Sequence, residues 1–161
     1  MRLNLDLGEL PDEPEALVSL AHMVNVACGA HAGDAVIAAR ALRGALAHGA
    51  QAGAHPSFPD RENFGRTALE LDDTALRATL DAQLAWLRSV ASSVGAPLAH
   101  VKPHGALYHA ADRDERVART IIDASRAALG EVALVGPPDG AMESCARPPP
   151  LAPPPPAPPP P

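Results

Sequence analysis

Four short segments of the chain place polar side chains at the end of a strand-like run. They cover residues 4–9, 25–31, 53–57 and 100–105. Because alternate side chains of a strand lie on one face, Asn4 shares a face with Asp6, and His100 with Lys102 and His104. Four strand ends that converge on one polar interior are typical of the mouth of an α/β barrel, where barrel enzymes hold their active sites.

The run His100-Val101-Lys102-Pro103-His104 carries the strongest signal of chemistry. Two imidazoles and an ammonium on one strand face repel each other when all are charged, so packing alone rarely selects them. A cation in such a row could act as an acid or clamp an anionic group. The plainer alternative is an exposed strand face.

Two carboxylates and two further histidines lie at other strand ends. Asp6 and Glu9 follow the first strand and could bind a metal or divide acid and base roles, or else be a turn residue and a solvated one. His31 and His55 each follow a glycine-containing strand end. Together with Asp6, these histidines could supply nitrogen and oxygen ligands to a divalent metal ion.

Two more residues have a chemical and a structural interpretation. Arg66 follows a Gly/Pro-containing loop and could clamp a carboxylate or phosphate with both arms, or form a surface salt bridge. Cys28 could be a nucleophile beside His31. We favour the alternative that Cys28 is a small buried apolar residue.

The hydrophobic pattern alternates between strands and helices. The expected strands are 2–7, 23–28, 50–55, 98–104 and 131–136, and the expected helices are 14–21, 35–48, 72–94 and 113–129. Asp34 is a predicted N-cap, and glycines follow the helices at 49, 95 and 130. Strand–helix alternation of this kind predicts an α/β fold of parallel strands with right-handed crossovers.

The chain changes character after Gly136, where residues 137–161 hold 13 prolines. Proline cannot donate a backbone hydrogen bond, so we predict a folded domain over 1–136 and a disordered, polyproline-like tail over 137–161. The tail could be a linker or a ligand for a proline-binding module. We favour a frameshift or truncation, since the α/β pattern stops within the fold.

The composition excludes several classes of protein. The 161 residues carry a formal net charge of −6 without a basic run, which argues against nucleic acid as a partner. No apolar run approaches the roughly 18 residues of a membrane span, and the N-terminus lacks the pattern of a signal peptide. With only two cysteines, we predict a reduced, cytoplasmic protein.

Five motifs together resemble those of the LamB/YcsF family, the A subunit of bacterial 5-oxoprolinase. They stand here at 4–9 (NLDLGE), 25–34 (NVACGAHAGD), 53–60 (GAHPSFPD), 63–66 (NFGR) and 100–108 (HVKPHGALY). Their order and spacing agree with the family over roughly residues 1–136. Three departures are mild: Leu5 replaces a usual alanine, Ala30 a usual aromatic residue, and Asn63 a usual glycine. The serious departure is the missing last third of the family's chain, with its remaining strands and a segment near F-A-D-R.

The resemblance implies a fold and a reaction. The fold is a seven-stranded β/α barrel of the glycoside hydrolase/deacetylase type, of which this chain would hold about five strands. The reaction is ATP-dependent opening of the 5-oxoproline lactam to glutamate, with B and C subunits as partners. We expect the truncated chain to lack this activity, because its barrel would stay open and its site loosely held.

Individual roles follow from the resemblance as hypotheses. Lys102 and Arg66 suit the binding of phosphate from ATP, and Asp6 and Glu9 the orientation of water or a metal. His31, His55 and His104 suit proton transfer.

Two alternatives stay open at this stage. The first is a metal-dependent amide or carbohydrate deacetylase on the same barrel, with Asp6, His31, His55 and His104 holding the ion. The second is an inactive fragment whose proline-rich tail binds a partner.

Overall fold

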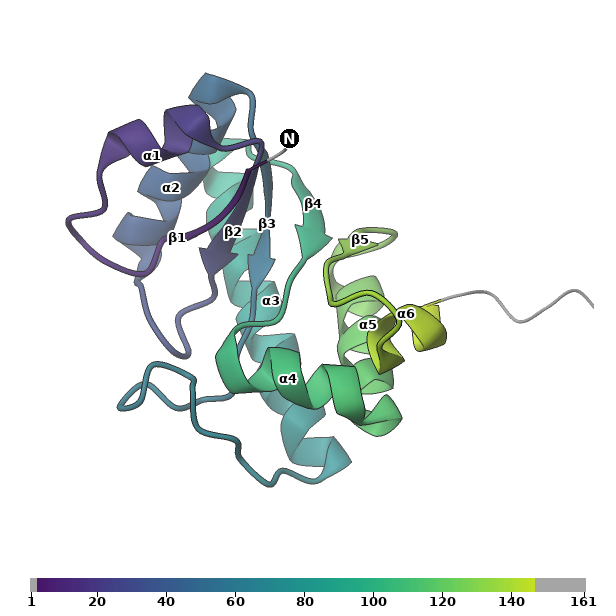
Figure 1. The fold of residues 1–161 in the computed structure, drawn as a ribbon. Coiled ribbons are helices and arrows are strands. Elements are labelled where there is room, and N and C mark those ends of the chain that lie inside the picture. Colours follow the sequence, from purple (N-terminus) through teal and green to yellow (C-terminus); the bar gives the residue numbers. More distant parts are fainter. Residues whose placement is uncertain (1–2, 147–161) are drawn as a thin grey trace, which may run out of the picture.

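The computed structural model describes residues 3–146 as one sheet of five strands with helices packed around it (Figure 1). The strands are β1 (Asn4–Leu7), β2 (Met23–Ala27), β3 (Gln51–His55), β4 (Leu98–Val101) and β5 (Ala133–Leu134). The helices are α1 (Glu15–Leu20), α2 (Ala35–His48), α3 (Asp73–Val94), α4 (Gly105–Arg113), α5 (Glu115–Leu129) and α6 (Ala141–Ala146).

The sheet confirms the predicted fold class. All neighbouring strands pair in parallel, and their order in the sheet is the order in the chain, β1-β2-β3-β4-β5. This mixed α/β arrangement is consistent with part of a β/α barrel. Because parallel strands all end on the same side, the polar segments that follow β1, β2, β3 and β4 meet at one edge of the sheet.

Two of the predicted helices, α2 and α3, have the ends expected from sequence. Asp34 accepts hydrogen bonds from the first-turn amides of α2, and Asp72 caps α3 in the same way. Both helices end at a glycine with a left-handed backbone, Gly49 and Gly95. The predicted apolar stripe of α3 is buried in the core and holds Leu76, Leu80, Leu84 and Leu87.

Two boundaries near the site differ from the sequence prediction. The strand expected over 98–104 leaves the sheet after Val101, because Pro103 has no amide hydrogen and α4 begins at Gly105. The helix expected over 113–129 is preceded by a separate helix, α4. The two meet at Asp114, whose side chain caps α5 and interrupts a continuous helix.

The C-terminal part also differs from the sequence prediction. The strand expected over 131–136 is reduced to Ala133–Leu134. The disordered tail expected from residue 137 is wrong for residues 141–146, which form α6 and pack against α5 with Met142 buried. The burial of Met142 explains why this part of the proline-rich segment folds. The remaining tail, 147–161, and the expected strand start at residue 2 lie outside the described residues.

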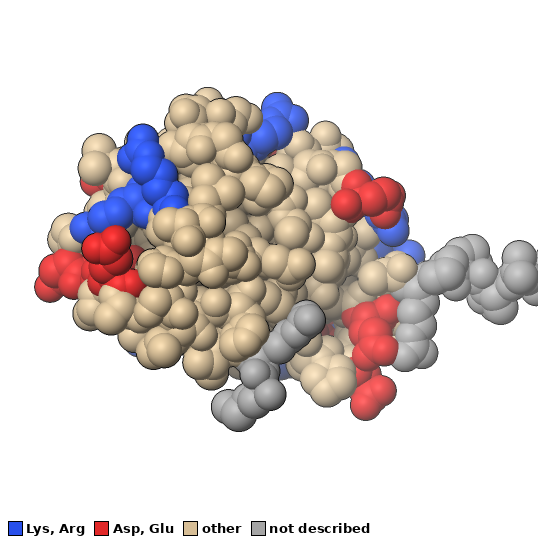
Figure 2. All heavy atoms as spheres, turned by 90° about the horizontal axis from the view of Figure 1, so that it is seen from above, with Lys and Arg blue, Asp and Glu red and all other residues tan. Residues whose placement is uncertain are grey.

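The face on which the strands begin carries scattered charges. Figure 2 shows it, with lysine and arginine side chains in separate places rather than in one continuous patch. Among residues 3–146, no helix is long and apolar enough to cross a membrane.

Candidate active site

One row of residues runs across four strands on the polar face of the sheet. Asp6 of β1 pairs in register with Asn25 of β2, Asn25 with Gly53 of β3, and Gly53 with His100 of β4. The missing side chain at Gly53 leaves room for the His100 ring, whose Nε2 lies 2.8 Å from Asn25 Oδ1. The side-chain oxygen Oδ1 of Asn25 can only accept a hydrogen bond, so His100 Nε2 carries the proton and donates it.

An ion pair between Asp6 and Lys102 lies at the β1 end of this row. Lys102 Nζ lies 2.7 Å and 3.0 Å from the two carboxylate oxygens of Asp6, and Asn25 Nδ2 donates to Asp6 Oδ1 at 2.7 Å. Burial by itself would raise the pKa of Asp6. The contacts of Asp6 with His55, Lys102 and Asn25 outweigh it and hold the pKa well below its usual range. Asp6 is therefore a carboxylate at neutral pH.

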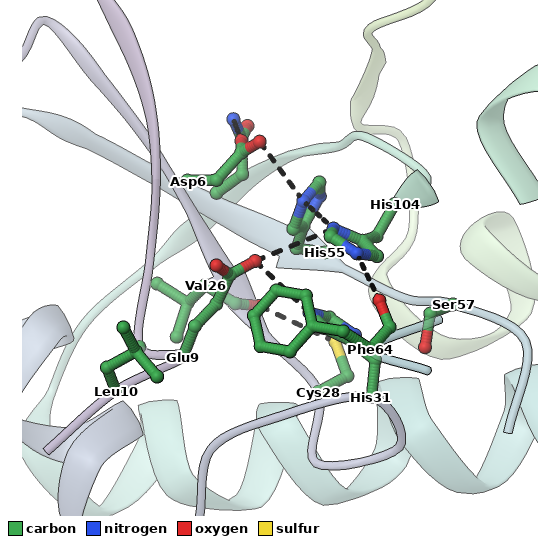
Figure 3. A network of polar contacts seen from close by, with 12 residues as sticks. Asp6, Glu9, Leu10, Val26, Cys28, His31, His55, Ser57, Phe64 and His104 are labelled. Atoms are coloured by element: carbon green, nitrogen blue, oxygen red, sulfur yellow. Dashed lines mark hydrogen bonds and ion pairs between the residues drawn. The ribbon is translucent and has the colours of Figure 1, made fainter. Parts of the chain in front are cut away.

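Three histidines and a second carboxylate lie next to the ion pair, and Figure 3 shows them beside Asp6. His55 Nε2 lies 3.4 Å from Asp6 Oδ2 and 3.0 Å from His104 Nδ1. The His31 ring stacks on the His104 ring with centroids 3.9 Å apart. Glu9 Oε1 lies 3.2 Å from His31 Nε2 and 3.5 Å from His104 Nδ1.

Burial controls the charge of these rings. It lowers the pKa of His31, against the hydrogen bond to Glu9, which raises it. It lowers the pKa of His104 to about 4, and the charge of His31 acts in the same direction. Burial and the charges of His55 and Lys102 also lower the pKa of His100 to about 4. At pH 7 these three imidazoles are neutral, so the site contains buried bases next to two carboxylates.

The loops around the cluster are held by side chains that donate to or accept from backbone. Glu13 accepts hydrogen bonds from the amides of Gly8, Glu9 and Leu10, which fixes the loop that carries Glu9. Arg61 donates to the carbonyl oxygens of Gly29 and Gly33 and so ties the loop of His31 to the loop after β3. These contacts position the site residues without touching the cluster themselves.

Gln83 of α3 holds the backbone two residues beyond His55. Its side chain accepts from the Ser57 amide at 3.0 Å and donates to the Ser57 carbonyl at 2.8 Å, and both residues are buried. Replacing it with leucine keeps the volume but leaves two buried backbone groups without partners. We expect Gln83→Leu to lower the free energy of unfolding by about 3 kcal/mol, measured by urea denaturation.

Gln51 provides a matched control, because its side chain is exposed at the start of β3. Gln51→Leu is expected to change the stability by less than about 0.5 kcal/mol. Equal effects of the two substitutions would mean that the Ser57 contacts do not stabilise the loop.

The predicted site residues divide into a central group and one peripheral residue. The structure brings together Asp6, Glu9, His31, His55, Lys102 and His104. Arg66 is exposed, and its guanidinium stacks on the Phe64 ring at 5.4 Å from the centroid. Within the described residues, Arg66 forms no hydrogen bond or ion pair with this group. Its predicted phosphate contact stays a prediction.

The candidate metal ligands are grouped differently from the sequence hypothesis. That hypothesis combined Asp6, His31 and His55. In the structure, ligand atoms of Asp6, His55 and His104 lie within 4.8 Å of one another, and so do those of Glu9, His31 and His104. His104 belongs to both sets, while His31 lies with Glu9 rather than with Asp6. The stacking of His31 on His104 explains the difference.

Cys28 is a core residue, as the sequence analysis favoured. It is buried, and burial raises the pKa of its thiol to about 12, which leaves it protonated and unreactive. The other cysteine, Cys145, is half-buried on α6. We therefore expect a thiol reagent to label Cys145 in the folded protein and both cysteines in denaturant. Rapid labelling of Cys28 in the folded state, located by peptide mass, would contradict this environment.

Four residues that hold the site together were not among the predicted site residues. They are Glu13, Asn25, Arg61 and Gln83. Asn25 had a usable signal, because it starts a polar segment at a strand end as Asp6 does. The other three lie in a loop or a helix, and no local pattern marks which distant backbone group they contact.

Comparisons with known proteins agree with the geometry. The model of the LamB/YcsF family matches residues 1–151. The crystal structure of the lactam utilization protein from Thermus thermophilus is similar to this chain, with a TM-score of 0.84 and 38% sequence identity. The similarity covers 91% of this chain and 62% of the Thermus protein. The chain thus spans less than two thirds of the length of that relative.

Proposed function

The chain belongs to the LamB/YcsF family, and on this premise we propose that it carries the lactam-opening site of an ATP-dependent 5-oxoprolinase. The substrate is 5-oxoproline and the product is L-glutamate. The observation that carries the proposal is the Asp6–Lys102 ion pair, which lies beside three buried histidines at the carboxyl ends of the strands. The name of the Thermus relative, a lactam utilization protein, supports the same substrate class.

The chemistry of a lactam explains why such a set of groups is useful. A lactam is a stable amide, and its carbonyl carbon accepts water poorly. Transfer of a phosphoryl group from ATP to the amide oxygen releases ADP and makes the ring carbon more electrophilic. Water then adds to this carbon, the C–N bond breaks with protonation of the nitrogen, and a second water hydrolyses the acyl phosphate to glutamate and phosphate. The negative charge on the phosphoryl group needs a nearby cation. Lys102 provides this cation, and Asp6 holds its ammonium in place through two contacts.

Water must also be oriented and deprotonated. Asp6 and Glu9 are separate carboxylates on either side of the histidine group, so each can hold a water molecule against a neighbouring imidazole. Neutral His104 and His31 can accept a proton at pH 7 and return it to the nitrogen that leaves the opened ring. Arg66 lies at the periphery and is assigned to phosphate binding.

ATP, the B subunit and the C subunit complete the proposed reaction. Cleavage of the lactam is tested by following glutamate release from 5-oxoproline with ATP and both subunits present. Two proteins are compared: the chain as it stands, and a chimera in which residues 1–146 are joined to the C-terminal remainder of the Thermus protein. The chimera restores the length of the relative, of which this chain spans 62%.

The proposal predicts glutamate release by the chimera that stops when ATP is omitted. Release that continues without ATP would favour the metal-dependent hydrolase instead. Absence of release from both proteins, with folding confirmed by circular dichroism, would contradict the proposal.

A further inference from the structure

Two ring nitrogens face each other at the centre of the histidine group without a proton to share. His55 Nδ1 lies 2.6 Å from the carbonyl oxygen of Lys102, and His104 Nε2 lies 2.9 Å from the carbonyl oxygen of Phe64. A carbonyl oxygen only accepts, so each of these nitrogens must carry its ring's hydrogen. The remaining nitrogens, His55 Nε2 and His104 Nδ1, then present lone pairs to each other across 3.0 Å.

Carboxylate oxygens extend this set of acceptors on both sides. Asp6 Oδ2 lies 3.4 Å from His55 Nε2, and Glu9 Oε1 lies 3.5 Å from His104 Nδ1. Acceptor atoms of Asp6, His55 and His104 thus lie within 4.8 Å of one another, and Glu9 lies beside His104. Such an arrangement is unfavourable by itself, and a cation at its centre would turn each repulsion into an attraction.

The local charge also favours a cation. Among the described residues, one ammonium group, that of Lys102, pairs with these two carboxylates, and it contacts Asp6 rather than Glu9. A ring N–H donated to a backbone carbonyl is in addition the usual way in which proteins orient a metal-binding histidine.

We propose that Asp6, His55 Nε2 and His104 Nδ1, whose ligand atoms lie within 4.8 Å of one another, form a binding site for a divalent cation of the zinc class, with Glu9 beside it. Two imidazole nitrogens with carboxylate oxygens suit zinc and its first-row neighbours rather than magnesium, which prefers oxygen ligands and keeps its water. Nitrogens bound to one zinc ion at about 2.1 Å lie roughly 3.4 Å apart in a tetrahedron. The observed 3.0 Å separation needs only a small ring movement to reach that spacing.

The metal site goes beyond the proposed lactam chemistry: an ion on His104 Nδ1 leaves proton transfer to His31, and its test measures binding rather than glutamate release. The test uses the untagged full chain, stripped with a chelator and dialysed. Zn²⁺ is titrated by calorimetry, and Co²⁺ is used as a coloured probe of tetrahedral nitrogen and oxygen coordination. We expect one Zn²⁺ per chain, a Co²⁺ visible spectrum without a thiolate band, and no comparable binding of Mg²⁺.

Three variants locate the ion. Asp6→Asn keeps the shape of the side chain and His104→Ala removes the shared nitrogen, and each is expected to weaken Zn²⁺ binding at least about a hundredfold. His48→Ala removes an exposed histidine at the end of α2 and is expected to leave binding unchanged. Circular dichroism checks that each variant is folded. If His104→Ala does not fold, Zn²⁺ binding by Asp6→Asn alone tests the site.

Three results would overturn the proposal. The first is the absence of Zn²⁺ and Co²⁺ binding by the folded chain, which would mean that the facing nitrogens share a proton instead. The second is undiminished binding by Asp6→Asn. The third is loss of binding in His48→Ala, which would place the ion at the surface.

Discussion

Replacing Lys102 with methionine is expected to lower ATP-dependent glutamate release about a hundredfold while changing the stability little. A positive charge placed where negative charge develops is worth about 3 kcal/mol in the transition state, and methionine cannot supply it. The effect on folding is small because the Lys102 and Asp6 side chains are 22% and 37% exposed, so water can replace the lost ion pair. The rate is measured in the chimera with both subunits, beside the thermal midpoint of the same preparation.

Arg77→Met is the matched control for this prediction. Arg77 also pairs with an aspartate, Asp81, but on the exposed face of α3 and away from the strand ends. We expect its removal to leave the rate unchanged. A loss of folded protein in Lys102→Met that equals the loss of activity would identify Lys102 as a structural residue instead.

Gly53→Ala is expected to have the largest effect on folding, with a loss of at least about 3 kcal/mol of unfolding free energy. A Cβ at this position would overlap ring atoms Cγ, Cδ2 and Nε2 of His100. The ring is buried between strands and cannot move away without giving up its hydrogen bond to Asn25. The loss therefore combines overpacking with an unsatisfied buried polar group. Urea denaturation monitored by circular dichroism measures it.

Gly49→Ala separates this clash from the ordinary cost of replacing a glycine. Gly49 has a φ of 70° at the end of α2, and nothing lies within 4 Å of a Cβ built on it. It is expected to cost only about 1 kcal/mol, which is the strain of a left-handed alanine. A Gly53→Ala loss no larger than this would show that His100 can repack, and that the row across the sheet tolerates a side chain at β3.

Much of the fold could be predicted from the sequence because local signals and long-range packing agree. Asp34 and Gly49 mark the ends of α2, and the leucine stripe from Leu76 to Leu87 marks the buried face of α3. The convergence of Asp6, His55, Lys102 and His104 also followed from sequence. Parallel strands end on one side of a sheet, so residues at four strand ends must meet.

The parts that could not be predicted depend on distant contacts. No local pattern indicates that Glu13 accepts three loop amides, or that Gln83 reaches the Ser57 backbone from α3. Helix α4 was not predicted because no capping side chain marks its start: its N-cap, His104, forms no side-chain capping hydrogen bond. The fold of α6 depends on the burial of Met142 against α5, which outweighs the surrounding prolines.

The central claim is that the strand-end cluster binds the lactam, and titration of the histidine rings with 5-oxoproline tests it most directly. The chain has seven histidines, of which His22, His48 and His109 are exposed outside the cluster and serve as internal controls. With ¹⁵N-labelled histidine, NMR reports each ring separately. We predict that added 5-oxoproline shifts the ring signals of His31, His55 and His104 and leaves the three exposed histidines unchanged. Unchanged cluster signals, or shifts confined to the exposed histidines, would contradict the account.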